Sequence, residues 1–252
     1  MALKRIMPCL LFDGKSLVKT VNFKKPNYIG DPINAIKIYN DKEVDELVLL
    51  DITATKENRK IDFNKIEKFA AESFMPFSYG GGVKTLDDFK NLYSVGIEKV
   101  IVNSVLFTDP DVVKRATDIF GSQSVVASLD VKTSFWGKYE VFSYSGRTSR
   151  KEILAFCDYL QDEIKVGEIL VTSVDNEGTW KGYDFKLIKK INQHVSIPVI
   201  ANGGAGSIED IKNVLYESDV NAAALGSMAV YQKKGMGVLI GFPKREKVIL
   251  DE

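Results

Sequence analysis

The amino-acid sequence predicts an α/β protein whose 252 residues (1–252) form a single (β/α)8 barrel, a TIM barrel built from two similar halves. Three observations predict this fold class. Short apolar runs alternate with amphipathic stretches along the chain, the two halves repeat the same motifs, and no Pro- or Ser-rich linker divides them. Eight strand–helix units typically close into a barrel of about 250 residues. A doubly wound open sheet is the alternative architecture.

Eight runs of β-branched and apolar residues are the expected strands, and each is followed by Gly, Asp or Asn. Strands that alternate with single helices pair in parallel, so their carboxyl ends meet at one rim. In chain order the runs are RIMPCLL (5–11), ELVLLDI (46–52), MPFSYGGG (75–82), KVIVNS (99–104), SVVASLDV (124–131), EILVTSV (168–174), IPVIANGG (197–204) and AAALGS (222–227).

Amphipathic segments with apolar residues at helical spacing lie between these runs. Several begin with Asp, Ser or Thr, as helix N-caps do. The expected helices are DPINAIKIYNDK (31–42), KTLDDFKNLYSVG (84–96), DPDVVKRATDIFG (109–121), RKEILAFCDYLQDE (150–163), DFKLIKKINQHV (184–195) and SIEDIKNVLYES (207–218).

An internal repeat supports the two-halved barrel. ELVLLDITAT is followed after about 33 residues by YGGGV, and EILVTSVDNEGT is followed at nearly the same distance by NGGAGS. KVIVNSV and NAAALGSM also occupy equivalent places. Each half therefore brings one Gly-rich loop to the same rim.

Composition excludes several classes of protein. The 34 basic and 34 acidic residues cancel, so the broad basic surface of a nucleic-acid-binding protein is missing. No apolar stretch reaches the roughly 18 residues that span a bilayer, and no secretory signal is recognisable, so we expect a cytoplasmic protein without membrane association. Two cysteines and one histidine, His194, provide no metal site, and no cofactor motif is present, so neither a metal nor a cofactor is expected.

The Gly-rich loops are candidate phosphate sites, because glycine lets backbone N–H groups approach an anion closely. Either cluster alone could be only a tight turn between strand and helix. Its recurrence favours phosphate binding, with residues at the ends of the next strands completing each site. The candidates are Gly81, Gly82, Asn103 and Ser104 in the first half and Gly203, Gly204, Gly226 and Ser227 in the second.

Two aspartates, Asp51 and Asp130, end otherwise apolar strands, where barrel enzymes place their chemistry. Asp130 is the candidate general acid or base, because an apolar strand end can raise the pKa of a carboxyl group. For Asp51, substrate binding and a structural N-cap or salt bridge remain alternatives. Asp175 and Thr179 occupy the equivalent loop of the second half and are candidate substrate contacts, and Lys19 lies in a loop long enough to act as a lid.

Together these motifs resemble the cyclase subunit of imidazole glycerol phosphate synthase, over roughly the first 230 residues. The motifs are LVKTVNFKKPNYIGDP, DELVLLDITATKENR, YGGGV, VNS, SLDVK, VFSYSGR, GEILVTSVDNEGTWKGYD and ANGGAGS. The resemblance implies a duplicated barrel, a substrate with a phosphate at each end, and a separate glutaminase partner docked under the amino-terminal face. It also implies that ammonia travels through the barrel past a gate of four charged residues, which match Arg5, Glu46, Lys99 and Glu168. The alternative for these four is a structural salt-bridge ring.

The chain departs from that family at one catalytic position. The family uses a pair of aspartates, and Asp130 matches the second, but Leu11 stands where the first is expected. The carboxyl-terminal segment also lacks a long final amphipathic helix. Both departures resemble a paralogous group that is associated with surface-polysaccharide genes and supplies ammonia for converting an acetamido sugar into an acetamidino sugar.

Three functional hypotheses follow. The first is an ammonia-delivering synthase subunit that amidates a nucleotide-linked sugar or another phosphorylated small molecule, and the second is the histidine-pathway cyclase. The third is a non-catalytic barrel that activates its glutaminase and hands ammonia to another enzyme. Isomerisation of an aminoaldose phosphate, the activity of a sister family, is disfavoured by the VNFKKPNYIGDP segment and the four gate residues.

Overall fold

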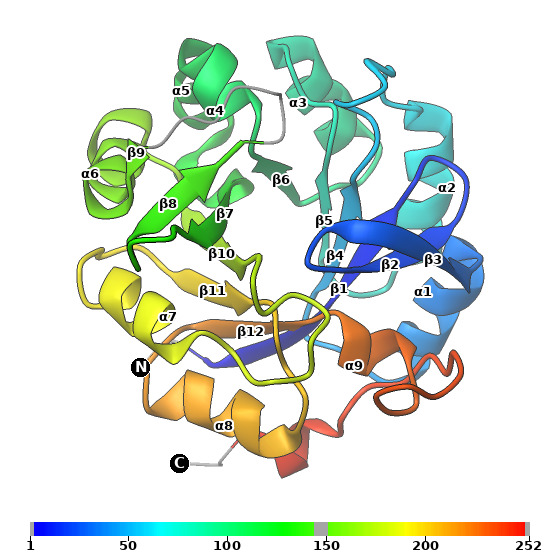
Figure 1. Cartoon of the computed structure of the whole chain (residues 1–252). Coiled ribbons are helices and arrows are strands. Elements are labelled where there is room, and N and C mark those ends of the chain that lie inside the picture. Colours follow the sequence, from blue (N-terminus) through cyan, green and yellow to red (C-terminus); the bar gives the residue numbers. More distant parts are fainter. Residues whose placement is uncertain (1–2, 144–150, 250–252) are drawn as a thin grey trace.

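The computed structural model describes residues 3–143 and 151–249, and it contains the closed barrel that the sequence predicts (Figure 1). Eight parallel strands pair in a ring, in which β12 pairs with β1 and β7 pairs with β10. Because this ring has no edge strand, the open doubly wound sheet is excluded. The barrel strands are β1 (Arg5–Phe12), β4 (Leu47–Asp51), β5 (Phe77–Gly80), β6 (Lys99–Val102), β7 (Val125–Thr133), β10 (Glu168–Ser173), β11 (Val199–Asn202) and β12 (Ala222–Leu225).

Helices surround the barrel and confirm the six predicted segments (Figure 1). Six of these helices have an N-cap side chain that accepts a hydrogen bond from the first turn. The helices are α1 (Pro32–Asp41), α2 (Phe63–Glu72), α3 (Leu86–Ser94), α4 (Val105–Thr108), α5 (Pro110–Phe120), α6 (Ile153–Asp158), α7 (Phe185–Asn192), α8 (Ile208–Tyr216) and α9 (Ser227–Val230), with the 3₁₀ turns η1 (Ser122–Ser124) and η3 (Arg245–Lys247) and the π-helical η2 (Tyr159–Ile164).

The helix α2 is an addition to the predicted set, and its sequence carried the signal. Asp62 caps it by accepting from the Lys65 N–H, while Ile66 and Phe69 are buried against the barrel at a spacing of three residues. The predicted segment 150–163 is divided between α6 and η2, and Arg150 itself and residues 144–147 of the VFSYSGR motif lie outside the described residues. In the described part of the chain no helix is long and apolar enough to cross a membrane.

Apolar side chains form two separate layers. One fills the space between the strands and the helices, and a smaller cluster fills the barrel itself. Successive side chains of a strand point to opposite faces, which is why Met7 and Cys9 belong to the inner cluster and Ile6 and Leu10 to the outer one. The inner cluster consists of Met7, Cys9, Val48, Ile101, Val126, Leu170, Ile200, Ala222 and Ala224.

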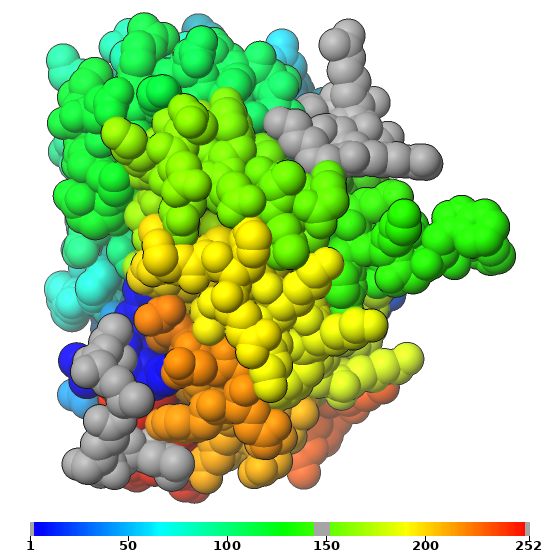
Figure 2. Space-filling model, turned by 90° about the vertical axis from the view of Figure 1, so that its left-hand side faces the viewer, coloured from blue at the N-terminus to red at the C-terminus, as the bar shows by residue number. Residues whose placement is uncertain are grey.

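Two hairpins extend the carboxyl rim. β7 continues into an antiparallel pairing with β8 (Tyr139–Phe142), which also pairs with β9 (Lys151–Glu152), and the tip of this hairpin projects from the rim in Figure 2. The expectation that Lys19 lies in a loop is wrong. Lys19 lies on β2 (Leu17–Val21), which pairs with β3 (Lys24–Gly30). Both residues of the intervening turn, Asn22 and Phe23, have positive φ angles of 50° and 60°, as a two-residue hairpin turn requires.

Candidate functional site

A cavity of about 280 Å³ opens at the carboxyl rim of the barrel, where the resemblance places the chemistry. It gathers residues from both halves of the chain. Of the predicted site residues, the cavity is lined by Lys19, Asp51, Gly81, Gly82, Asn103, Ser104, Asp130, Gly203, Gly204, Gly226 and Ser227. Asp175 and Thr179 are not among the lining residues, and their loop contributes Glu177 and Gly178 instead.

The two Gly-rich turns have matching backbones. Gly81 and Gly82 follow β5 with φ angles of 115° and 76°, and Gly203 and Gly204 follow β11 with 91° and 110°. A Cβ atom on Gly81 would collide with the backbone carbonyl of Asp51, and one on Gly204 with that of Gly182. The turns themselves therefore require glycine, and both turns face the same cavity.

The strands next to these turns complete two equivalent arrangements. Asn103 and Ser104 follow β6 and lead into α4, and Gly226 follows β12 and precedes Ser227, the first residue of α9. Both helices have four residues. We call the two sets the first cup (Gly81, Gly82, Asn103, Ser104) and the second cup (Gly203, Gly204, Gly226, Ser227). A Gly-rich turn beside the start of a short helix is the usual phosphate site of TIM barrels.

Asp130 is positioned near the carboxyl end of β7, between the two cups in chain order. The Asn103 Nδ2 donates to its Oδ2 at 3.2 Å and to the Ser128 carbonyl oxygen at 2.9 Å. Desolvation, and secondly the negative charge of Glu177, raises the pKa of Asp130 from 3.8 to about 7. A carboxyl group with that pKa can both hold and release a proton near neutral pH, as a general acid or base must.

The opposite, amino-terminal end of the barrel is closed by a ring of alternating charges. Arg5 binds Glu46 at 2.7 Å and Glu168 at 3.0 Å, and Lys99 binds the same two carboxylates at 3.0 and 3.1 Å. The Ser78 hydroxyl donates to Glu46 at 2.6 Å. All four predicted gate residues thus form one closed network, which we call the charged ring.

Residues 5–235, which include both cups and the charged ring, match the family described as "Histidine biosynthesis protein". The chain belongs to this family. A relative from Pseudomonas aeruginosa, provisionally named imidazole glycerol phosphate synthase subunit hisF2, is 46% identical over 98% of this chain and 99% of its own. Imidazole glycerol phosphate synthase subunits HisF from Alkaliphilus metalliredigens and Methanococcus vannielii are 40% and 36% identical, each over 92% of this chain and over 92% and 93% of their own chains. The resemblance inferred from the motifs is confirmed.

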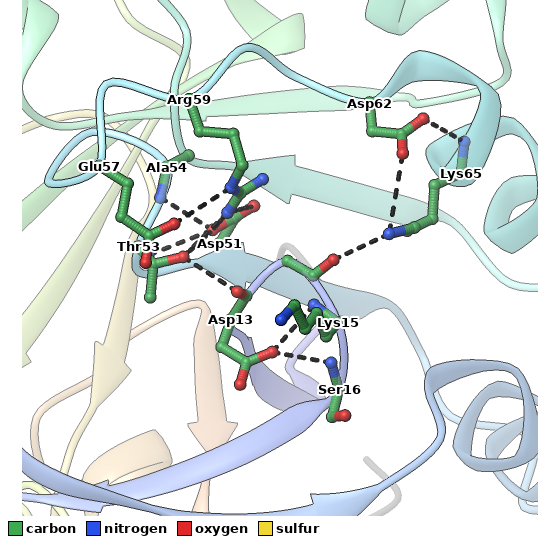
Figure 3. A network of polar contacts seen from close by, with 11 residues as sticks. Asp13, Lys15, Ser16, Asp51, Thr53, Ala54, Glu57, Arg59, Asp62 and Lys65 are labelled. Atoms are coloured by element: carbon green, nitrogen blue, oxygen red, sulfur yellow. Dashed lines mark hydrogen bonds and ion pairs between the residues drawn. The ribbon is translucent and has the colours of Figure 1, made fainter.

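Leu11, the departure from the family's motif, lines the cavity as a half-buried side chain of β1. The nearest acid, Asp13, does not line it. One Asp13 carboxylate oxygen accepts hydrogen bonds from the Lys15 N–H at 2.9 Å and the Ser16 N–H at 2.7 Å, so this side chain stabilises its own turn (Figure 3). Asp13 therefore does not replace the carboxylate that is missing at position 11.

Asp51 forms a salt bridge, the structural alternative considered for it. Both of its carboxylate oxygens accept from Arg59 Nη2 at 2.8 Å, and one also accepts from the N–H groups of Thr53 and Ala54 at 3.1 and 3.0 Å (Figure 3). Sequence reasoning missed Arg59. The signal available was a buried strand-end carboxylate that needs a cationic partner, with an arginine eight residues further along the chain.

Glu177, also missed, connects the β2–β3 hairpin to the loop after β10. It forms a buried ion pair with Lys19, and it accepts from the Thr20 hydroxyl and the Phe23 N–H, both at 3.1 Å. The Asn22 N–H donates to the Glu177 carbonyl oxygen at 2.9 Å. Among the described cavity-lining carboxylates, Asp130 is consequently the one without a cationic partner.

We expect Glu177→Gln to destabilise the fold, because it leaves the buried Lys19 ammonium without a counter-charge. Removing one partner of a buried ion pair typically costs about 3–5 kcal/mol. Urea unfolding measures the change, and the double variant Lys19→Met/Glu177→Gln should recover much of the loss. A Glu177→Gln variant within about 0.5 kcal/mol of the wild type, the range of ordinary surface changes, would contradict the role of this pair.

Proposed function

We propose that this protein takes ammonia from a separate glutaminase subunit at its amino-terminal face and uses it on a phosphorylated substrate in the carboxyl-rim cavity. The acceptor that we propose is a nucleotide-linked sugar whose acetamido group becomes an acetamidino group, as a cytoplasmic step towards surface polysaccharide. This chain acts as the ammonia-dependent synthase subunit, and the glutaminase supplies the ammonia.

The arrangement along the barrel axis is the observation that carries the proposal. The charged ring lies at one end, the inner apolar cluster in the middle and the cavity at the other end. Neutral ammonia can enter an apolar interior, whereas the ammonium ion and other charged species pay a large desolvation cost there. One buried oxygen of Glu168 in the ring, Oε2, has no hydrogen-bond partner among the described residues, and it is available to an N–H group of ammonia.

The cavity supports a phosphorylated substrate and proton transfer. The two cups present backbone N–H groups and the Ser104 and Ser227 hydroxyls, a set of donors that suits two phosphate groups. In amidination the acceptor's carbonyl oxygen leaves as water while the ammonia nitrogen replaces it. Asp130, which is protonated below about pH 7, is the group positioned to give a proton to that oxygen.

Two alternatives keep specific support. The histidine-pathway cyclase is supported by the cups, by Asp130 and by the names of the relatives. A non-catalytic barrel that activates its glutaminase and passes ammonia to another enzyme is supported by Leu11. Incubating the chain with a glutaminase of the family, glutamine and either acceptor distinguishes them: an acetamidino sugar supports our proposal, an imidazole product supports the cyclase, and release of ammonia with neither product supports the non-catalytic barrel.

We expect Ala222→Leu to separate glutamine from ammonium as nitrogen sources. Ala222 belongs to the inner apolar cluster, so a leucine there fills the space between the charged ring and the cavity. The glutamine-dependent reaction should fall strongly while the reaction with added ammonium salt persists. Ala223 on the same strand belongs to the outer cluster, so Ala223→Leu is the matched control for overpacking, which typically costs about 1–3 kcal/mol. An equal loss with both nitrogen sources would contradict passage through the barrel.

A further inference from the structure

A second cavity, of about 290 Å³, lies outside the barrel between the ends of β1, β4 and β5 and the start of α2. The proposed function does not use it. Asp51 lines both cavities, so its carboxylate forms part of the wall between them. The second cavity is lined by Phe12, Gly14, Asp51, Arg59, Lys60, Ile61, Asp62, Lys65, Ile66 and Tyr79.

Three cationic side chains line this cavity against two carboxylates, and both carboxylates are already engaged. Asp51 accepts from Arg59 and from two backbone N–H groups. Asp62 caps α2 through the Lys65 N–H at 3.1 Å and lies 3.7 Å from the Lys65 ammonium. Lys60 is exposed. The lining therefore has an excess of positive charge, which favours an anionic ligand.

Two of the cations are fixed over one glycine. The Arg59 guanidinium lies so close to Gly14 that a Cβ there would approach its central carbon to 2.7 Å, and the Lys65 Nζ donates to the Gly14 carbonyl oxygen at 2.8 Å. Figure 3 shows both side chains reaching towards the turn that follows Asp13. The Lys65 ammonium also pairs with Asp62, but at 3.7 Å this contact is longer than a hydrogen bond. An ammonium group has three N–H donors and Gly14 uses one, so two are available to a ligand.

Tyr79 adds an uncharged donor that is not used within the described residues. Its side chain is 1% exposed and lines the cavity, and none of the hydrogen bonds among residues 3–143 and 151–249 involves its hydroxyl. Burial raises the pKa of Tyr79, so the hydroxyl keeps its proton and remains a donor. The hydroxyl is not one of the fully buried atoms that lack a partner, so it is accessible and can donate to a ligand in the cavity that accepts hydrogen bonds.

We propose that the second cavity binds a small oxyanion of the phosphate monoester class between the Arg59 and Lys65 cations and the Tyr79 hydroxyl. An anion there competes with Asp51 for Arg59. Because Asp51 also lines the carboxyl-rim cavity, occupancy of the second cavity changes the charge presented to the substrate, which makes it an effector site.

Titration calorimetry with inorganic phosphate tests the site in a Ser104→Asp/Ser227→Asp background, whose added carboxylates repel phosphate from the two cups. We expect one phosphate per chain and about tenfold weaker binding after Tyr79→Phe or Lys65→Met, since each removes a hydrogen bond to a charged group. Tyr79→Phe loses no hydrogen bond within the described residues, and Lys68→Met on the helix of Lys65 is the control for loss of a lysine.

Three results would overturn the proposal: no phosphate binding in this background, affinity unchanged by Tyr79→Phe and Lys65→Met, or a crystal soaked in phosphate whose second cavity stays without the ion. Failure of the proposed function would be recognised by a different observation. It appears as cups without phosphate in the wild-type crystal, whatever the second cavity binds.

Discussion

Asp130→Asn is expected to lose the acceptor reaction by about 10²–10⁴-fold, the usual contribution of a general acid or base. Asparagine keeps the shape of the side chain but cannot release or supply the proton. Glutaminase stimulation should be retained, because the charged ring at the opposite end of the barrel does not involve Asp130. Steady-state rates with saturating acceptor measure the loss. A variant with more than a tenth of the wild-type rate would remove Asp130 from the chemistry.

The same carboxyl group predicts how stability depends on pH. Its folded-state pKa of about 7 lies above the usual 3.8, so between those values the folded chain holds a proton that the unfolded chain has released. The stabilising contribution is therefore complete below about pH 4 and declines as pH rises to about 7. Asp130→Asn does not titrate, so its stability relative to the wild type should rise across this window by the order of a few kcal/mol. A constant difference from pH 4 to 8 would contradict the raised pKa.

Leu11→Asp is expected to raise turnover of the histidine-pathway intermediate by as much as about 10²–10⁴-fold, from a very low wild-type rate. A leucine cannot move a proton, and Leu11 and Asp130 line the same cavity, so the substitution restores a carboxylate facing Asp130's site. Formation of the imidazole product in the presence of a family glutaminase measures the gain. Leu10→Asp is not a suitable control because Leu10 is buried in the outer core, so Leu11→Asn serves as the isosteric one.

The prediction for Leu11 would be wrong if Asp13 supplied the missing carboxylate. Asp13 lies two residues beyond Leu11, about 6–7 Å further along the chain direction. Its carboxylate accepts hydrogen bonds from two backbone N–H groups of its own turn. We therefore expect Asp13→Ala to leave cyclase turnover unchanged at its low level. Efficient wild-type turnover that Asp13→Ala does not diminish would show that the histidine-pathway function is right and that the emphasis on Leu11 is wrong.

The fold could be predicted because its signals are local. Apolar periodicity located all eight barrel strands, and N-cap residues such as Asp31 and Ser207 marked helix starts within one residue. The β2–β3 hairpin escaped prediction because its turn, Asn22-Phe23, contains no glycine, although both residues adopt positive φ angles. Lys19, within the short run Leu17–Val21, was consequently interpreted as part of a loop.

The site was predicted only as far as strand ends determine it. The cups directly follow strands, Asp130 lies near the end of β7, and the charged ring lies at strand starts, so topology alone brings these residues together. Side chains within long loops depend on the path of the loop. Asp175 and Thr179 were expected at the substrate, but the turn after β10 directs Glu177 and Gly178 to the cavity. Asp175 instead accepts from the Thr133 N–H at 2.8 Å, and the Lys19–Glu177 pair joins residues 158 positions apart, which no local pattern reveals.

The source of the nitrogen in the product tests the account most directly. The chain and a family glutaminase are supplied with amide-¹⁵N glutamine, an excess of unlabelled ammonium salt and the nucleotide-linked acetamido sugar, and mass spectrometry measures the label in the acetamidino product. Transfer through the barrel predicts that the product carries ¹⁵N despite the unlabelled ammonium outside, and that Ala222→Leu abolishes this preference. A product whose label matches the diluted pool in solution would contradict a protected route from the charged ring to the cavity.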